Sequence, residues 1–370
     1  MTQQELTELN LGQSLDDLAN LDPRGYGVCK ILYAAARERA GEPLTMHCAR
    51  ALHRSIKPND FVYIITGFVL RPFKKAETDG IISAVLLARA LVLAFGAKPV
   101  LVCQEENVQA AKAIAAVCGL HTYDSMDAIR ALPIAMAVIP FTKDRAAAEA
   151  QADGLIAQAL PAAVVSIEAP GANAVGEYHN ATGLNMTELE AKLDVLFAKL
   201  QALGVLNIAI GDLGNEIGMG AIAGQLRQYI PYAGPGRCRC AATSDITGVV
   251  SDCSGGIAAA TAADYLLTAT VSDWGCYGMI AALAFLRENV EIMHDAELER
   301  AACEAAARAG MIDMYGWAIP SIDGFGLAIN TSLVTLMREC AREALQLKST
   351  CKTWFEKTLE LGYFEGAANA

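Results

Sequence analysis

The stretch Leu206–Gly220 combines residue types that could do chemistry. Leu206–Ile210 is an apolar run that predicts a buried strand, and Asp212, Asn215 and Glu216 follow it directly. Glycines that let a backbone approach a ligand alternate with these residues, at Gly211, Gly214, Gly218 and Gly220. In α/β proteins ligands bind beyond the carboxyl ends of such strands. A turn that merely caps the next helix does not need two carboxylates, an amide and four glycines, so we interpret the stretch as a site.

Other polar segments follow predicted strands in the same way. They are Glu77-Thr78-Asp79, Glu168 with the loop Gly171–Asn180, and Ser244-Asp245. We expect them to meet the first stretch at one rim of a sheet and to bring several carboxylates together. Such a cluster is costly unless a cation neutralises it.

Two interpretations of this cluster stay open. Either the carboxylates hold Mg²⁺ or Mn²⁺, with Asp212 and Glu216 as candidate ligands, or they bind the amine of an amino-acid substrate. His179 lies in the glycine- and asparagine-rich loop. It is either an acid–base group near neutral pH or an ordinary surface residue.

Strands and helices must alternate to position these segments. The apolar patterns predict strands that are separated by helical stretches, at residues 61–66, 98–103, 134–139, 162–167 and 206–210. This alternation is typical of a Rossmann-like three-layer α/β sandwich, with a mostly parallel sheet and helices on both faces. We divide the chain into a helical N-terminal extension (1–57), the α/β domain (58–326) and a C-terminal helical extension packed on it (327–370).

Later segments are less regular. Residues 239–243 and 248–250 favour short strands, and the alanine-rich residues 255–267 favour a helix. Met311–Phe325 is rich in glycine and aromatic residues, which is typical of an irregular loop over a site. The apolar helices after residue 255 are compatible with a homodimer.

The composition excludes several classes of protein. Of 370 residues 54% are hydrophobic and 19% charged, which excludes disorder of the whole chain, and a net charge of −12 argues against nucleic-acid and anionic-membrane partners. The apolar runs are too short to span a membrane. Eleven scattered cysteines and the absence of a signal-like N-terminus favour the cytoplasm. The glycine spacings match neither a dinucleotide fingerprint nor a P-loop, so we expect neither NAD nor ATP.

Four motifs resemble those of the D-glutamate cyclase family and occur in the family's order. They are Glu77–Gly80, Glu168–Gly171 with Gly176–Asn180, Ile210–Gly220 and Val271–Gly275, and the resemblance runs to about Asp323-Gly324. It implies a lyase of the hydro-lyase type that converts D-glutamate, or a related acidic amino acid, to 5-oxo-D-proline and water.

This sequence departs from the family's pattern at several positions. Leu213 stands where the family usually has glycine, and Ala169 and Thr182 stand where it has arginines, the usual partners of a carboxylate. Val175 and His179 also differ from the typical motif. A non-catalytic binder or sensor of an acidic amino-acid metabolite, and a metal-dependent hydrolase of a small amide, are therefore alternative interpretations.

The resemblance also suggests how the site would work. Lactam formation needs a base for the substrate ammonium, and Glu216 or Asp212 is the candidate, with Asp79 completing the catalytic set. Thr78, Asn215 and N–H groups near Gly214 and Gly171 are candidate oxyanion donors, which a divalent metal could replace. The other substrate-binding residues that the resemblance implies are Glu168, Tyr178, His179, Asn180, Ser272 and Trp274.

Overall fold

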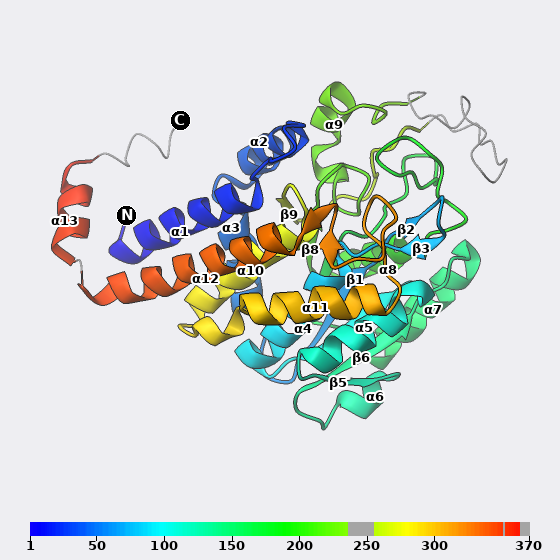
Figure 1. The fold of residues 1–370 in the computed structure, drawn as a ribbon, viewed down its shortest axis with the longest axis horizontal. Coiled ribbons are helices and arrows are strands. Elements are labelled where there is room, and N and C mark those ends of the chain that lie inside the picture. The colour runs from blue at the N-terminus through cyan, green and yellow to red at the C-terminus, as the bar shows by residue number, and fades with distance from the viewer. Residues whose placement is uncertain (236–254, 351, 363–370) are drawn as a thin grey trace.

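A parallel sheet forms the centre of the molecule. The computed structural model describes residues 1–235, 255–350 and 352–362. Its main sheet has seven strands in the order β5-β6-β4-β1-β7-β8-β9, and all neighbouring strands are parallel (Figure 1). The strands are β1 (Phe61–Thr66), β4 (Lys98–Cys103), β5 (His121–Tyr123), β6 (Ala135–Pro140), β7 (Ala163–Ile167), β8 (Leu206–Gly211) and β9 (Tyr265–Thr268).

Helices cover both faces of this sheet, which confirms the predicted three-layer α/β sandwich. One face carries α3 (Leu44–Ser55), α4 (Ile81–Phe95), α5 (Glu105–Val117) and α10 (Ser272–Leu286). The other face carries α6 (Met126–Ile129), α7 (Arg145–Gln158) and α8 (Leu193–Ala202). The inner helices α4 and α10 are buried along nearly their whole length, because a further helical layer lies outside them.

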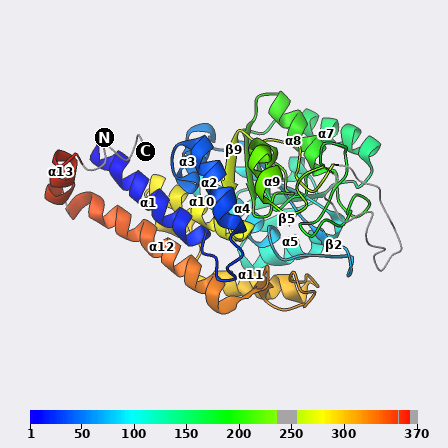
Figure 2. The same ribbon diagram turned by 90° about the horizontal axis from the view of Figure 1, so that it is seen from above.

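That further layer joins the two ends of the chain. α1 (Gln3–Ala19) and α12 (Leu327–Thr350) run side by side over α10, and α11 (Ala296–Arg308) covers α5 (Figure 2). The smaller helices are α2 (Val28–Ala40), α9 (Ala223–Tyr229) and α13 (Lys352–Glu360). One hydrophobic core extends from Leu11 to Ala344, so both helical extensions share it with the sheet. Among the described residues no helix is long and apolar enough to cross a membrane.

The sequence prediction of a helix at residues 255–267 is wrong. Residues 255–264 form no helix, and β9 follows them. Their backbone groups instead bond to the glycine-rich loop after β8: the Thr261 carbonyl accepts the N–H groups of Gly218 and Gly220, and the Ala259 N–H donates to the Gly214 carbonyl. Tertiary hydrogen bonds thus override the helix propensity of alanine. The predicted strands at 239–243 and 248–250, and Ser244-Asp245, lie outside the described residues.

The segment Met311–Phe325 is partly regular rather than an irregular loop. β10 (Ser321–Ile322) and β11 (Phe325–Gly326) form a hairpin whose two-residue turn is Asp323-Gly324. Both turn residues have positive φ, +48° and +76°, as a type I′ turn requires. A second short hairpin, β2 (Val69–Leu70) with β3 (Lys75–Ala76), lies between β1 and α4.

Candidate functional site

The site lies where the direction of strand addition reverses. The chain leaves β1 for β4 on one side and later returns to β7 on the other, so β1 and β7 border a topological switch point. Ligands bind at such points, beyond the carboxyl ends of the strands. A cavity of about 160 Å³ lies there, and its lining residues are Phe68, Leu70, Glu77, Asp79, Glu168, Asn180, Ala181, Thr182, Asp212, Leu213, Asn215, Met314 and Asp323.

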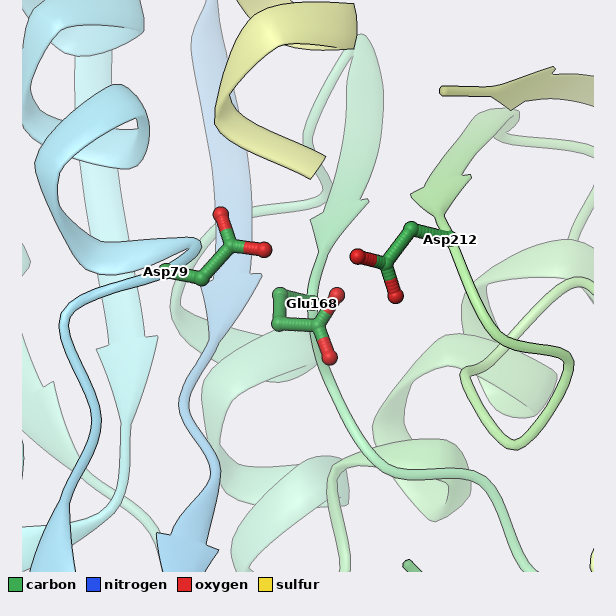
Figure 3. A group of neighbouring side chains, drawn as sticks. All are labelled: Asp79, Glu168 and Asp212. Carbon is green, nitrogen blue, oxygen red and sulfur yellow. The ribbon is translucent and has the colours of Figure 1, made fainter. Parts of the chain in front are cut away.

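Three of the lining carboxylates converge. Asp79 stands just before α4, Glu168 follows β7 and Asp212 follows β8. Each offers one oxygen such that the three atoms lie within 4.8 Å of one another (Figure 3). All three residues are buried, with 3%, 6% and 4% of their surface exposed. The sequence prediction that these three segments meet at one rim is therefore confirmed.

Asp79 and Asp273 each cap the N-terminus of the helix next to the other. The Asp79 carboxylate accepts the backbone N–H groups of Ser272 (3.1 Å) and Asp273 (2.9 Å) at the start of α10. The Asp273 carboxylate in return accepts the N–H groups of Gly80 (2.9 Å) and Ser83 (3.2 Å) at the start of α4. Because the first N–H groups of a helix have no partner within the helix, both carboxylates satisfy donors that would otherwise be orphaned.

Glu168 has an unusual backbone conformation and packs closely against its neighbours. Its φ is +44°, a conformation that non-glycine residues rarely adopt. The Ser272 hydroxyl donates to its Oε2 at 2.6 Å. A Cβ added to Gly80 would lie 2.6 Å from both the Glu168 Cβ and the Thr66 Oγ1, so only glycine fits beneath this carboxylate.

The loop after β8 is shaped by Glu216. Its carboxylate accepts the N–H groups of Leu213 (2.9 Å) and Gly214 (2.7 Å), and more weakly that of Asp212 (3.4 Å). Glu216 is fully buried and is not among the cavity-lining residues. Its carboxylate thus binds its own loop, which leaves Asp212 as the loop's carboxylate in the cavity.

Two fully buried acceptors in the cavity lining have no hydrogen-bond partner among the described residues. One is Asp212 Oδ1. The other is Asn215 Oδ1: the Asn215 amide nitrogen donates to the His179 carbonyl at 3.0 Å, which fixes the orientation of the amide. A buried acceptor without a donor is destabilising, so these oxygens indicate a ligand that supplies N–H groups or positive charge.

Burial and mutual repulsion raise the pKa values of these carboxyl groups. The pKa of Asp79 is raised well above its usual value by burial and next by Asp273, that of Glu168 by burial and Glu216, and that of Asp212 by burial and Glu168. Among the described residues that line the cavity there is no lysine, arginine or histidine. Carboxylate oxygens in this arrangement suit a hard divalent cation such as Mg²⁺ or Mn²⁺, and the unpartnered Asp212 Oδ1 fits that role.

Three of the predicted oxyanion donors are not among the cavity-lining residues. Thr78 is fully buried and its hydroxyl has no partner among the described residues. The N–H groups of Gly214 and Gly171, expected as oxyanion donors, donate to Glu216 Oε2 and to the Asn215 carbonyl. The Thr78 hydroxyl and the second N–H of the Asn215 amide are therefore the donors of that predicted set whose hydrogens are not used by other described residues.

Three predicted binding residues point elsewhere. The Tyr178 hydroxyl donates to the Asp194 carboxylate, and the Trp274 indole donates to Asn330 Oδ1 at 2.8 Å. His179 is buried rather than on the surface, and burial lowers its pKa. None of these side chains is among the cavity-lining residues, whereas Asn180 is.

Sequence reasoning missed Asp323 and Arg24. Asp323, in the turn of the β10–β11 hairpin, lines the cavity. Its Oδ2 accepts a hydrogen bond from Arg24 Nη2 at 2.5 Å, and Arg24 Nη1 donates to its backbone carbonyl at 3.2 Å. Burial raises the pKa of Asp323 to about 6, against the opposing effect of Arg24. The dipeptide Asp-Gly is a hairpin signal that could have located the turn, but no local pattern could have located Arg24.

Comparison with known proteins agrees with this site. A family model described as "D-glutamate cyclase-like, C-terminal" matches residues 15–338. The human (Homo sapiens) protein "D-glutamate cyclase, mitochondrial" is 29% identical over 160 residues, which are 43% of this chain and 22% of that protein. The chain thus matches about a fifth of that relative's length. The family match includes every cavity-lining residue. This chain therefore belongs to the D-glutamate cyclase-like, C-terminal family.

Proposed function

We propose that the protein is a D-glutamate cyclase-like lyase. It would join the amine of D-glutamate, or of a related acidic amino acid, to the carbon of the side-chain carboxyl group, and release 5-oxo-D-proline and water. The observation that carries the proposal is the convergence of Asp79, Glu168 and Asp212 in a small cavity within the family-matched region. The cavity volume, about 160 Å³, suits a small metabolite and lies below the roughly 300–1,000 Å³ of drug-sized ligand sites.

The side chains divide the work as follows. Asp79, Glu168 and Asp212 would hold a divalent cation, which when bound acts as a Lewis acid on a carboxyl oxygen. Asp212 would bind the cation through one oxygen and take a proton from the substrate ammonium with the other, because the Glu216 carboxylate binds its own loop. The Thr78 hydroxyl and the second N–H of the Asn215 amide are the candidate donors to the oxygen that develops negative charge. The cavity walls hold the substrate folded, so that ring closure replaces a bimolecular encounter.

An NMR time course of the purified protein tests the proposal. D-glutamate and L-glutamate are supplied separately, each with EDTA and with Mn²⁺. Formation of 5-oxoproline from D-glutamate, faster with Mn²⁺, is the expected result. No product from either enantiomer under any condition would contradict the lyase assignment.

A second candidate function uses the same carboxylates. Asp79, Glu168 and Asp212 could equally hold a cation for metal-dependent hydrolysis of a small amide, in which the cation would supply activation of water. Incubation with glutamine separates the two functions, because hydrolysis of 5-oxo-D-proline is only the reverse of cyclisation. Release of glutamate and ammonia from glutamine, without any cyclisation of glutamate, would favour the hydrolase.

A further inference from the structure

Asp323 differs from the other carboxylates that line the cavity. It is not one of the three that converge, and it comes from a different part of the cavity wall, the turn of the β10–β11 hairpin. Among the described carboxylates that line the cavity, it is the one that pairs directly with an arginine. Its side chain is 11% exposed, so its charge is largely withdrawn from water.

Arg24 is itself held rigidly. Its guanidinium lies over the rings of Phe325, at 4.5 Å, and Tyr26, at 5.4 Å. The Asp22 carboxylate accepts the N–H groups of Tyr26 (3.2 Å) and Gly27 (2.7 Å) and so fixes the turn that carries Arg24. Since planar stacking orders the guanidinium before it pairs, Arg24 fixes the position of Asp323 Oδ2.

This arrangement leaves Asp323 Oδ1 for another partner. The hydrogen bonds that described residues make to Asp323 reach Oδ2 and the backbone carbonyl. Asn215 Oδ1, whose orientation the His179 carbonyl fixes, is a second acceptor in the same lining and has no partner among the described residues. Two oriented acceptors suit a group with several N–H donors and a positive charge, and an ammonium group has three such donors.

We propose that Asp323 binds the substrate's α-ammonium group, with Asn215 Oδ1 as its second acceptor and Arg24 as the residue that positions Asp323. The assignment rests on the proposed function, because it names the residue that recognises the amine of that substrate. It separates two tasks within the cavity: Asp79, Glu168 and Asp212 bind the cation, and the hairpin wall selects substrates that carry an amine.

The test compares two ligands that differ in the ammonium group. The dissociation constants of D-glutamate and glutarate are measured for the full-length protein with Mn²⁺ present, and the Mn²⁺ affinity is measured separately. The variants are Asp323→Asn, Arg24→Gln and the control Asp127→Asn, which removes a carboxylate that also pairs with an arginine, Arg130, but does not line the cavity. Circular dichroism and thermal unfolding show that each variant is folded.

The wild-type protein is expected to prefer D-glutamate to glutarate by at least about tenfold. Asp323→Asn should reduce this preference by roughly ten- to a hundredfold, as expected for loss of a charge-assisted hydrogen bond. Arg24→Gln should reduce it by about three- to tenfold, because Asp323 remains but is no longer fixed. Asp127→Asn should keep it, and Asp323→Asn should still bind Mn²⁺.

Three results would overturn the inference: no preference in the wild-type protein, an unchanged preference in Asp323→Asn, or a loss of Mn²⁺ binding in that variant. The last would make Asp323 a metal ligand instead. Failure of the proposed function has a different signature. In that case no 5-oxoproline forms, while the preference for the amine and its loss in Asp323→Asn persist.

Discussion

Asp212→Asn should stabilise the metal-free protein while it abolishes turnover. Asp212, Glu168 and Asp79 approach one another within 4.8 Å. Two unit charges at that distance repel by about 3.5 kcal/mol at an effective dielectric constant of about 20. Because their raised pKa values allow some of these groups to keep a proton, we expect a smaller net gain, about 1–3 kcal/mol at pH 8. The new amide nitrogen can also donate to a neighbouring carboxylate.

Thermal unfolding in EDTA and in excess Mn²⁺ measures this effect. A ligand at about 100 times its dissociation constant stabilises the folded state by about 2.7 kcal/mol, so Mn²⁺ should raise the midpoint of the wild-type protein and have little effect on the variant. The two proteins should therefore exchange their order of stability: the variant is more stable in EDTA, and the wild type is more stable in Mn²⁺. The difference in EDTA should shrink at pH 5, where more of these carboxyl groups are protonated.

The matched control is Asp17→Asn, which removes an exposed carboxylate on α1 and should leave both midpoints nearly unchanged. The reasoning would be refuted by a variant that is less stable than the wild type in EDTA by more than about 1 kcal/mol, a typical cost for a point substitution. A wild-type protein whose midpoint responds to neither Mn²⁺ nor Mg²⁺ would show that the cluster is not a cation site.

Three more predictions concern the framework of the site. Glu216→Gln should lower the free energy of unfolding, measured by urea denaturation, by about 2–3 kcal/mol. The reason is that one of the oxygens that accept loop N–H groups is replaced by an N–H donor. Unchanged stability would show that the loop does not depend on this carboxylate. Gly80→Ala should lower the free energy of unfolding several times more than Gly176→Ala. Both glycines have a positive φ (+83° and +86°), but a Cβ at position 176 would meet open space. Equal unfolding free energies of the two variants would exclude the steric argument. In EDTA the protein should lose stability as the pH rises from about 5 to 8. Burial raises the pKa of Asp323 to about 6 and that of Asp273 to about 7, so the folded state keeps protons that the unfolded chain has released. A thermal midpoint that rises over this pH range would contradict the prediction.

The sequence was sufficient for those parts of the site that follow from strand alternation. Asp79, Glu168 and Asp212 each belong to a segment that follows a strand, so a parallel sheet necessarily brings their segments to one rim. The role of Glu216 was not accessible in this way. A carboxylate four residues after Asp212 can either face a ligand or fold back on its own loop, and only the backbone conformation of that loop decides between them.

Contacts between distant segments could not be predicted. Arg24 and Asp323 are separated by 299 positions and lie in a turn and a hairpin whose packing depends on the whole core. The residues before β9 illustrate the same limit. Their alanines favour a helix, but the glycine loop after β8 offers donors and acceptors that a helix would leave unpaired.

The reciprocal capping of α4 by Asp273 and of α10 by Asp79 has a consequence for the order of folding during synthesis. The N-terminus of α4 leaves the ribosome about 190 residues before the aspartate that caps it, which at roughly 5–20 residues per second is a delay of about ten to forty seconds. During that time Asp79 has no helix N-terminus to bind, and the N–H groups of Gly80 and Ser83 have no carboxylate from α10. Neither helix start reaches its final form until both are present. The carboxylate cluster can therefore assemble only late, in one step with the docking of α10, and a chain that ends before α10 should have no partially active site.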